Sequence, residues 1–219
     1  MINRISGTIL YLFSVLVHRT CRFTFHGLDQ LKEYQNLDHP LIVTSWHGMT
    51  MMVAGFITKK MDFSDFSTII PDDYRGDVLA FFAYHLGVEP IKLNLSGDST
   101  FGLGRKLVSL VKKMTGGKNL LIHPDGPAGP AYLVKPGLSF IAQKTGASII
   151  PVGCYCRNAY HINRWDRYTL PLPFSRIHIQ IGDLITIPKE LKDLEETNRM
   201  LEDVLNGLTL QASAKYYLE

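Results

Sequence analysis

Cysteine is scarce in this sequence, and its spacing builds neither a disulfide framework nor a metal site. Three cysteines occur among 219 residues, and Cys154 and Cys156 are separated by one residue within an apolar stretch. A small, odd number of thiols is more typical of reduced core cysteines than of disulfides. We therefore predict that Cys21, Cys154 and Cys156 are free thiols.

The sequence also lacks a strong excess of charge of either sign. The net charge is +3 with an isoelectric point near 8.7, and no basic run is interleaved with aromatic residues. This balance is compatible with anionic lipid or phosphate, but it is too weak to indicate a nucleic-acid partner.

The N-terminal apolar segment from Ile5 to Val17 is too short to cross a bilayer, which needs about 20 apolar residues. No small-x-small cleavage site follows it, so we predict that it is retained. Two interpretations stay open: a helix in the membrane interface with Arg19 and Arg22 towards the head groups, or a helix packed on the domain. We favour the first, with 1–22 as an anchor and 23–219 as one domain.

Two families of catalytic motif are missing as well. There is no Gly-x-Ser-x-Gly elbow and no His-Glu-x-x-His pair, which disfavours a hydrolase and a metalloenzyme. His123 beside Asp125 is only a second-rank ligand pair, so we predict no metal site.

The sequence does contain a regular alternation of apolar strand and helix patterns. Predicted strands cover 21–25, 40–46, 67–70, 88–93, 120–122, 148–153 and 176–182, and predicted helices cover 49–57, 78–86, 101–114, 138–145 and 191–218. This spacing predicts an α/β fold with a mostly parallel central sheet, mixed at its edge and flanked by helices. We place 176–182 at the edge, with His178 towards solvent or a neighbouring strand, and expect the last helix to break near Asn206-Gly207.

Two segments resemble functional sites. The apolar run 120–122 leads into a loop stiffened by prolines and opened by glycines, which carries His123, Asp125 and Lys135. A surface turn without chemistry is the alternative for this loop. The second segment is His47, at a strand-to-helix junction where backbone N–H groups are unpaired.

These segments resemble the lysophospholipid acyltransferase superfamily. The resemblance is carried by Trp46-His47-Gly48, the loop His123-Pro124-Asp125-Gly126-Pro127-Ala128-Gly129-Pro130, Lys135-Pro136-Gly137, 142–147 and Pro151-Val152-Gly153. The Asp-Gly-Pro-x-Gly-Pro loop is similar to a bacterial branch of unassigned function, and so are Trp165-Asp166-Arg167 and 171–175.

The resemblance implies transfer of an acyl group from acyl-CoA or acyl-carrier protein to a hydroxyl of a lipid or lysolipid acceptor. His47 would be the general base, and Asp125 would take the place of the superfamily's glutamate. Imidazole suits this step because its ordinary pKa is about 6.5. Lys92 falls where an arginine is common in the superfamily. The predicted substrate-binding residues are Lys92, Ser96, His123, Gly126, Pro127 and Lys135.

One departure from the superfamily concerns the base. Its usual motif is His-x-x-x-x-Asp, but Met52 stands five residues after His47. Asp125, Asp98 or Asp73 would have to reach the imidazole through space, or the base works unassisted. The rival hypothesis is a non-catalytic lipid-binding protein on an acyltransferase scaffold, because losing an orienting carboxylate is costly.

The resemblance further implies a peripheral protein on the cytoplasmic side of the inner membrane. The partners would be the membrane surface, the acceptor and the thioester donor, with no cofactor besides that donor.

Overall fold

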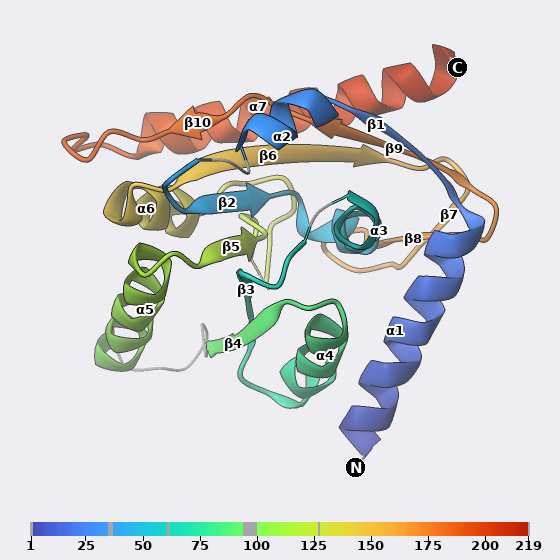
Figure 1. Ribbon diagram of the computed structural model, residues 1–219, viewed down its shortest axis with the longest axis horizontal. Helices are drawn as coiled ribbons and strands as arrows, with labels where there is room; N and C mark the ends of the chain where they lie inside the picture. Colours follow the sequence, from blue (N-terminus) through green and yellow to red (C-terminus); the bar gives the residue numbers. More distant parts are fainter. Residues whose placement is uncertain (1, 35–36, 61, 94–99, 127, 219) are drawn as a thin grey trace.

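The computed structural model describes residues 2–218 except 35–36, 61, 94–99 and 127 (Figure 1). The helices are α1 (Ile2–Thr20), α2 (Leu28–Tyr34), the 3-10 turn η1 (His47–Met49), α3 (Thr50–Lys60), α4 (Tyr74–His85), α5 (Thr100–Thr115), α6 (Pro136–Thr145) and α7 (Glu195–Leu218). The strands are β1 (Arg22–His26), β2 (Leu41–Thr44), β3 (Phe66–Pro71), β4 (Glu89–Leu93), β5 (Asn119–Ile122), β6 (Ser148–Tyr155), β7 (Ala159–His161), β8 (Thr169–Pro171), β9 (Arg176–Ile181) and β10 (Ile185–Thr186).

Eight of these strands form one mostly parallel sheet with helices packed around it, as predicted. The order is β1-β9-β6-β2-β5-β3-β4, and β10 pairs with β6. Every neighbouring pair is parallel except β6–β9 and β6–β10, which are antiparallel. The carboxyl ends of β6, β2 and β5 therefore lie at the same edge of the sheet, because parallel strands all point the same way.

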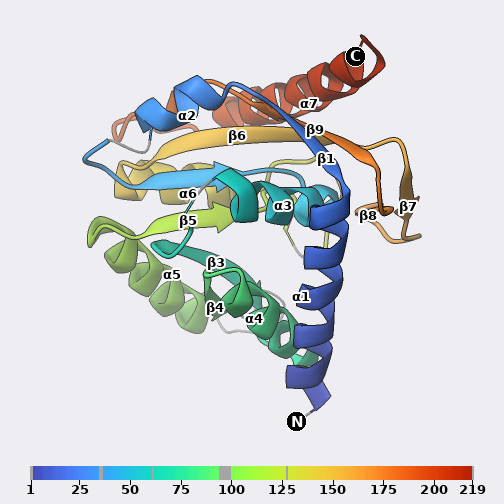
Figure 2. The ribbon, with the colours of Figure 1, turned by 45° about the vertical axis from the view of Figure 1, so that its right-hand side comes forward.

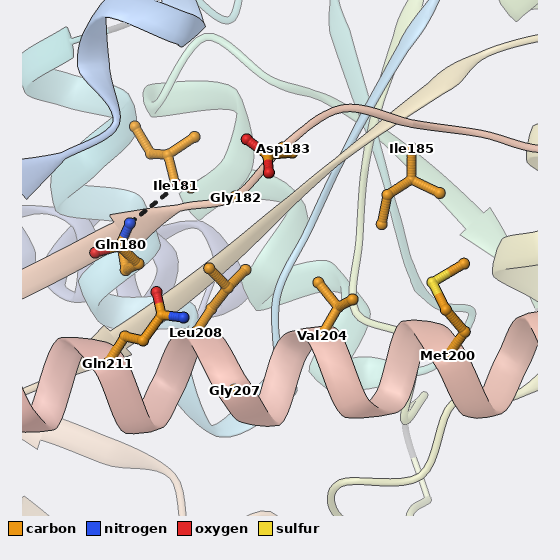
Figure 3. A pocket seen from close by; sticks show the side chains of 10 residues that line it. All are labelled: Gln180, Ile181, Gly182, Asp183, Ile185, Met200, Val204, Gly207, Leu208 and Gln211. Atoms are coloured by element: carbon orange, nitrogen blue, oxygen red, sulfur yellow. Dashed lines mark hydrogen bonds between the residues drawn. The ribbon is translucent and has the colours of Figure 1, made fainter.

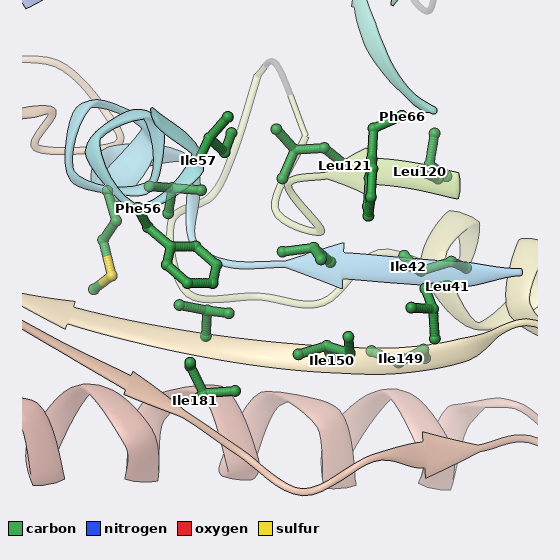
Figure 4. Close-up of a cluster of buried hydrophobic side chains, with 14 of the residues drawn as sticks. Leu41, Ile42, Phe56, Ile57, Phe66, Leu120, Leu121, Ile149, Ile150 and Ile181 are labelled. Atoms are coloured by element: carbon green, nitrogen blue, oxygen red, sulfur yellow. The ribbon is translucent and has the colours of Figure 1, made fainter. Parts of the chain in front are cut away.

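The centre of the sheet is apolar on both faces. All four residues of β2 are buried, and Ile42 stacks between Leu120 of β5 and Ile149 of β6, its partners in register. All three side chains are 0% exposed and belong to the cluster in Figure 4. A strand buried on both sides needs this continuous apolar run rather than an alternating one.

Two sequence predictions about the C-terminal part are wrong. β9 is not an edge strand, because it lies between β1 and β6. Of the two orientations predicted for His178, solvent is excluded by its 1% exposure, and the ring lies 5.7 Å from that of His26 on the neighbouring strand β1. The last helix does not break at Gly207 but runs unbroken from Glu195 to Leu218. Its buried face packs on β6 and β9, and that packing outweighs the cost of about 1 kcal/mol for a glycine inside a helix.

Helix α1 lies along one side of the molecule and packs on α4 and α3 (Figure 2). In the described part of the chain, no helix combines the length and apolar character that crossing a bilayer requires. The three cysteines are buried free thiols, as predicted.

Candidate active site

Three loops meet at the carboxyl edge of the central strands. One follows β2 and begins the turn η1 with His47, and another follows β5 and carries His123 and Asp125. The third follows β6 and includes the small antiparallel pair β7–β8. Because β6, β2 and β5 are adjacent, these loops converge although they are far apart in the sequence.

The imidazole of His47 is paired with a carboxylate that the sequence analysis did not propose. Its Nδ1 lies 2.8 Å from Oδ2 of Asp166, which is 119 residues away in the chain. Asp166 has a fully buried side chain, and Arg164 Nη2 donates to the same oxygen at 3.1 Å. His47 is 24% exposed at its side chain, so the ring is reachable from solvent while its partner is not.

Two glycines allow the loop that carries Asp166 to approach the loops that follow β2 and β5. A Cβ at Gly48 would lie 2.2 Å from the carbonyl oxygen of Asp166. At Gly129, where φ is +68°, a Cβ would lie 2.5 Å from Cε3 of Trp165. Neither position accepts a side chain without a shift of its neighbours. The two motifs of the sequence resemblance are therefore shaped to hold the segment that carries Asp166.

Asp125 meets His47 through the backbone and not through the ring. Its Oδ1 accepts from the backbone N–H of His47 at 3.0 Å. The carboxyl group is 1% exposed, and burial raises its pKa to about 6, although the hydrogen bond from His47 opposes that rise. Asp125 thus fixes the position of the turn that presents the imidazole.

His123 is held by the protein at both ring nitrogens. Nδ1 lies 2.9 Å from the carbonyl oxygen of Ser45, and Nε2 lies 3.1 Å from Oγ1 of Thr50. Burial, together with the nearby charge of His47, lowers the pKa of His123 to about 3. A ring that stays neutral at physiological pH offers no positive charge to an anionic group.

The surroundings of His47 favour its neutral form. Burial lowers the pKa of the imidazole, the hydrogen bond and charge of Asp166 raise it, and Arg164 lowers it; burial is the largest effect. The ring also lies against Trp165, with centroids 5.4 Å apart, and against Tyr168 at 6.4 Å. A neutral imidazole with Nδ1 held by a carboxylate presents Nε2 as a proton acceptor.

The remaining predicted residues are dispersed. Lys92 on β4 is paired with Asp77 of α4, and Asp73 caps α4 by accepting from Arg75 and Gly76 N–H groups. Lys135 reaches over Gly126, where a Cβ would lie 3.2 Å from its Nζ. Ser96, Asp98 and Pro127 lie outside the described residues.

A cavity of about 410 Å³ lies elsewhere, between α7 and the β9–β10 region (Figure 3). Its walls are Gln180, Ile181, Gly182, Asp183, Ile185, Met200, Val204, Gly207, Leu208 and Gln211. None of the site residues lines this cavity. Within the described ranges, no three His, Cys, Asp or Glu side chains gather as metal ligands would.

Asp166 and Arg164 are the residues that sequence reasoning missed. Asp166 already belonged to the Trp165-Asp166-Arg167 segment of the resemblance, and it is the one acidic residue between 155 and 182. A lone carboxylate in a stretch rich in arginine is the signal that would have identified it.

The fold and the site together define an α/β protein with a His–Asp pair at the carboxyl edge of its central sheet. The crystal structure of the 1-acyl-sn-glycerophosphate (LPA) acyltransferase PlsC from Thermotoga maritima is similar, with a TM-score of 0.58. The match covers 95% of this chain and 78% of that one at 20% identity, which establishes a shared fold.

A comparison of sequences finds a bacterial relative. The chain is 25% identical over 203 residues to the uncharacterized protein RP090 of Rickettsia prowazekii, covering 92% of this chain and 88% of that protein. No family model matches the sequence.

Proposed function

We propose that this protein is an O-acyltransferase that moves a fatty acyl group from a thioester to a hydroxyl of a lipid or lysolipid acceptor. The acyltransferase fold supports the reaction class. The observation that carries the proposal is the 2.8 Å contact between His47 Nδ1 and Asp166 Oδ2. Asp166 supplies the carboxylate that the superfamily motif has at the position where this chain has Met52.

In the proposed reaction, Nε2 of His47 takes the proton of the acceptor hydroxyl. The oxygen attacks the thioester carbonyl carbon, the C–S bond breaks, and the imidazolium returns the proton to the departing thiolate. Asp166 keeps Nδ1 protonated and stabilises the imidazolium as it forms. Asp125 serves as a positioning residue because it holds the backbone of His47.

The substrate set in this proposal follows the sequence resemblance. The donor is acyl-CoA or acyl-carrier protein, and the protein works peripherally at the cytoplasmic side of the inner membrane. Lys135, close to Gly126 in the same loop as Asp125, is the cation we assign to an anionic group of the acceptor. Lys92 suits that role less well, because Asp77 already neutralises it.

The main reason for the rival hypothesis, a lipid-binding protein without catalysis, no longer applies. It was based on an imidazole with no carboxylate partner, and Asp166 supplies one from a distant loop. The rival would still be favoured by a purified protein that retains lipid and turns over no thioester.

The test uses the purified full chain with palmitoyl-CoA, a palmitoylated carrier protein and a panel of lysolipid and glycolipid acceptors. We expect acyl transfer to at least one acceptor and a loss of about 10²- to 10⁴-fold in His47→Ala. His39→Ala is the matched control, because His39 precedes the start of β2, at the end of the strand away from His47, where its Nε2 contacts Ser148. Transfer that is unchanged in His47→Ala would refute the role given to His47.

A further inference from the structure

The buried carboxylate of Asp166 has its hydrogen bonds concentrated on one oxygen. Oδ2 lies 2.8 Å from Nδ1 of His47 and accepts from Nη2 of Arg164 at 3.1 Å. The other oxygen, Oδ1, is buried and has no hydrogen-bond partner among the described residues. The imidazole and the guanidinium therefore share a single acceptor atom.

The burial of Asp166 calls for a positive charge beside it. Its side chain is 0% exposed, whereas that of Arg164 is 46% exposed. A carboxylate removed from water is costly unless a positive charge or several hydrogen-bond donors compensate it. A neutral imidazole supplies one hydrogen bond and no charge. Arg164 supplies the charge, because a guanidinium stays protonated throughout the physiological pH range.

Arg164 is held on the same loop as Asp166, which is the hairpin loop 162–168 between β7 and β8. The N–H of Ile162 closes this loop by donating to the carbonyl oxygen of Tyr168 at 3.0 Å. Inside the loop, the N–H of Arg164 donates to Ile162 at 2.8 Å. The guanidinium Cζ lies 5.8 Å from the centroid of the Tyr168 ring, a cation–π contact. The backbone and the Tyr168 ring thus hold Arg164 beside the carboxylate.

The titratable and charged groups that face His47 belong to the loops after β5 and β6. They are His123, Asp125, Arg164, Asp166 and Tyr168. Burial lowers the pKa of the imidazole most, Asp166 raises it, and the charge of Arg164 lowers it. Because burial lowers the pKa of His123 to about 3, that ring adds no charge near neutral pH. Arg164 is therefore the permanent cation of this set.

We propose that Arg164 is a positioning residue of the His47–Asp166 pair, which compensates the buried carboxylate through Oδ2 and leaves His47 to meet the acceptor as a neutral base. Without Arg164, the imidazolium itself would have to compensate Asp166, and the ring would hold its proton to higher pH. The consequence for the rate rests on the acyl transfer proposed above. The effect on the imidazole does not depend on any reaction.

The direct test is an NMR titration of the His47 ring in the full chain with isotope-labelled histidine, assigned by comparison with His47→Gln. In Arg164→Gln the midpoint of this titration should move to higher pH, opposite to the direction expected for Asp166→Asn. Arg164→Lys keeps the charge on a shorter side chain, so its midpoint should lie between those of wild type and Arg164→Gln.

Arg157→Gln is the matched control. Arg157 is an exposed arginine of the same connection after β6, and its guanidinium Cζ lies 5.8 Å from the ring centroid of Tyr217. The His47 ring should titrate in this variant as it does in wild type. Thermal unfolding of all variants identifies any that do not fold.

The kinetic test is the pH profile of kcat/KM with palmitoyl-CoA and the best acceptor. At pH 8.5 the rates of wild type and Arg164→Gln should agree within about threefold, because a positioned neutral base remains. At pH 5.5 the variant should lose roughly tenfold relative to wild type, since a hydrogen bond to a charged group typically changes an equilibrium by at least about that factor. Arg164→Lys should recover most of this loss.

Two results would overturn the role given to Arg164. One is a His47 titration in Arg164→Gln that is unchanged or moved to lower pH. The other is an equal loss of activity at every pH with a raised KM and an unchanged titration, which would assign Arg164 to an anionic substrate. If Arg164→Gln does not fold, Arg164→Lys decides, because a midpoint at or below that of wild type contradicts the proposal.

The titration separates this proposal from the acyl transfer itself, because it needs neither donor nor acceptor. A titration that moves as expected in a protein that turns over no thioester would refute the transfer and keep the role of Arg164. Transfer that depends on His47, with a titration unaffected by Arg164→Gln, would do the reverse.

Discussion

Asp166 is the residue whose replacement tests the proposed chemistry most directly. In Asp166→Asn the shape of the side chain is kept, but the atom facing Nδ1 of His47 at 2.8 Å becomes an amide oxygen or an amide nitrogen. An amide nitrogen there would force Nδ1 to accept and move the ring proton to Nε2. An amide oxygen would keep the tautomer but lose the negative charge that stabilises the imidazolium.

The size of the effect follows from what Asp166 supplies. A positioned general base contributes roughly 10²- to 10⁴-fold to a rate, and an imidazole in the wrong tautomer forfeits most of that. We therefore expect kcat/KM to fall by about 10²- to 10⁴-fold at pH 7. The double variant with His47→Ala should be no slower than His47→Ala alone, because both residues act in one step.

The pH profile supplies a readout that a loss of packing would not produce. The base works only when deprotonated, so activity falls as pH drops through the pKa of His47. The charge and hydrogen bond of Asp166 raise that pKa, whereas burial lowers it. Replacing Asp166 removes the raising contribution, and the acidic limb of the profile should move to lower pH.

The assay is acyl transfer from palmitoyl-CoA to the best acceptor between pH 4.5 and 8.5, with thermal unfolding measured in parallel. Asp65→Asn is the control, because Asp65 is a 74% exposed carboxylate paired with Lys118. A rate for Asp166→Asn within threefold of wild type, with an unchanged profile, would refute the dyad.

Three further changes test the surroundings of the site. Burial raises the pKa of Asp125 to about 6, so the contribution of this carboxyl group to stability is complete below about pH 4 and is lost as the pH rises through 6. Asp125→Asn should therefore be more stable than wild type at pH 8, by at most roughly 3 kcal/mol in its free energy of unfolding. At pH 4 the two proteins should be equally stable in the same thermal unfolding assay. The pKa of His123 is lowered to about 3, so the contribution of the neutral ring to folding stability is present above pH 6.5 and declines as the pH falls. Between pH 7 and pH 5, the free energy of unfolding in urea should therefore fall less for His123→Gln than for wild type. A Cβ at Gly48 would clash with the carbonyl oxygen of Asp166, so Gly48→Ala should lower stability by about 1–3 kcal/mol in denaturant unfolding and reduce acyl transfer at least tenfold. Gly207→Ala is the contrasting variant, because its Cβ would meet nothing within 4 Å, and it should stabilise the protein by about 1 kcal/mol in the same assay.

The sequence by itself determined the architecture and one half of the site. Apolar runs such as 41–44 and 120–122 can be satisfied only between two neighbouring strands and under covering helices, so their local pattern predicts a parallel sheet. Residues that follow such strands must gather at one edge. The loops that carry His47 and Asp125 do lie together at that edge, where the Asp125 carboxylate accepts from the backbone N–H of His47 at 3.0 Å rather than reaching the imidazole ring.

Only the tertiary structure decided the partner of the imidazole. Asp166 lies 119 residues after His47 in a loop without periodicity, and its position depends on three-dimensional packing against Gly48 and Gly129. The same reason explains the continuous α7 and the buried β9, where packing on neighbouring strands outweighs the local preference of Gly207. Local patterns record which residues must be buried, whereas the choice of which distant loops touch is made when the whole sheet assembles.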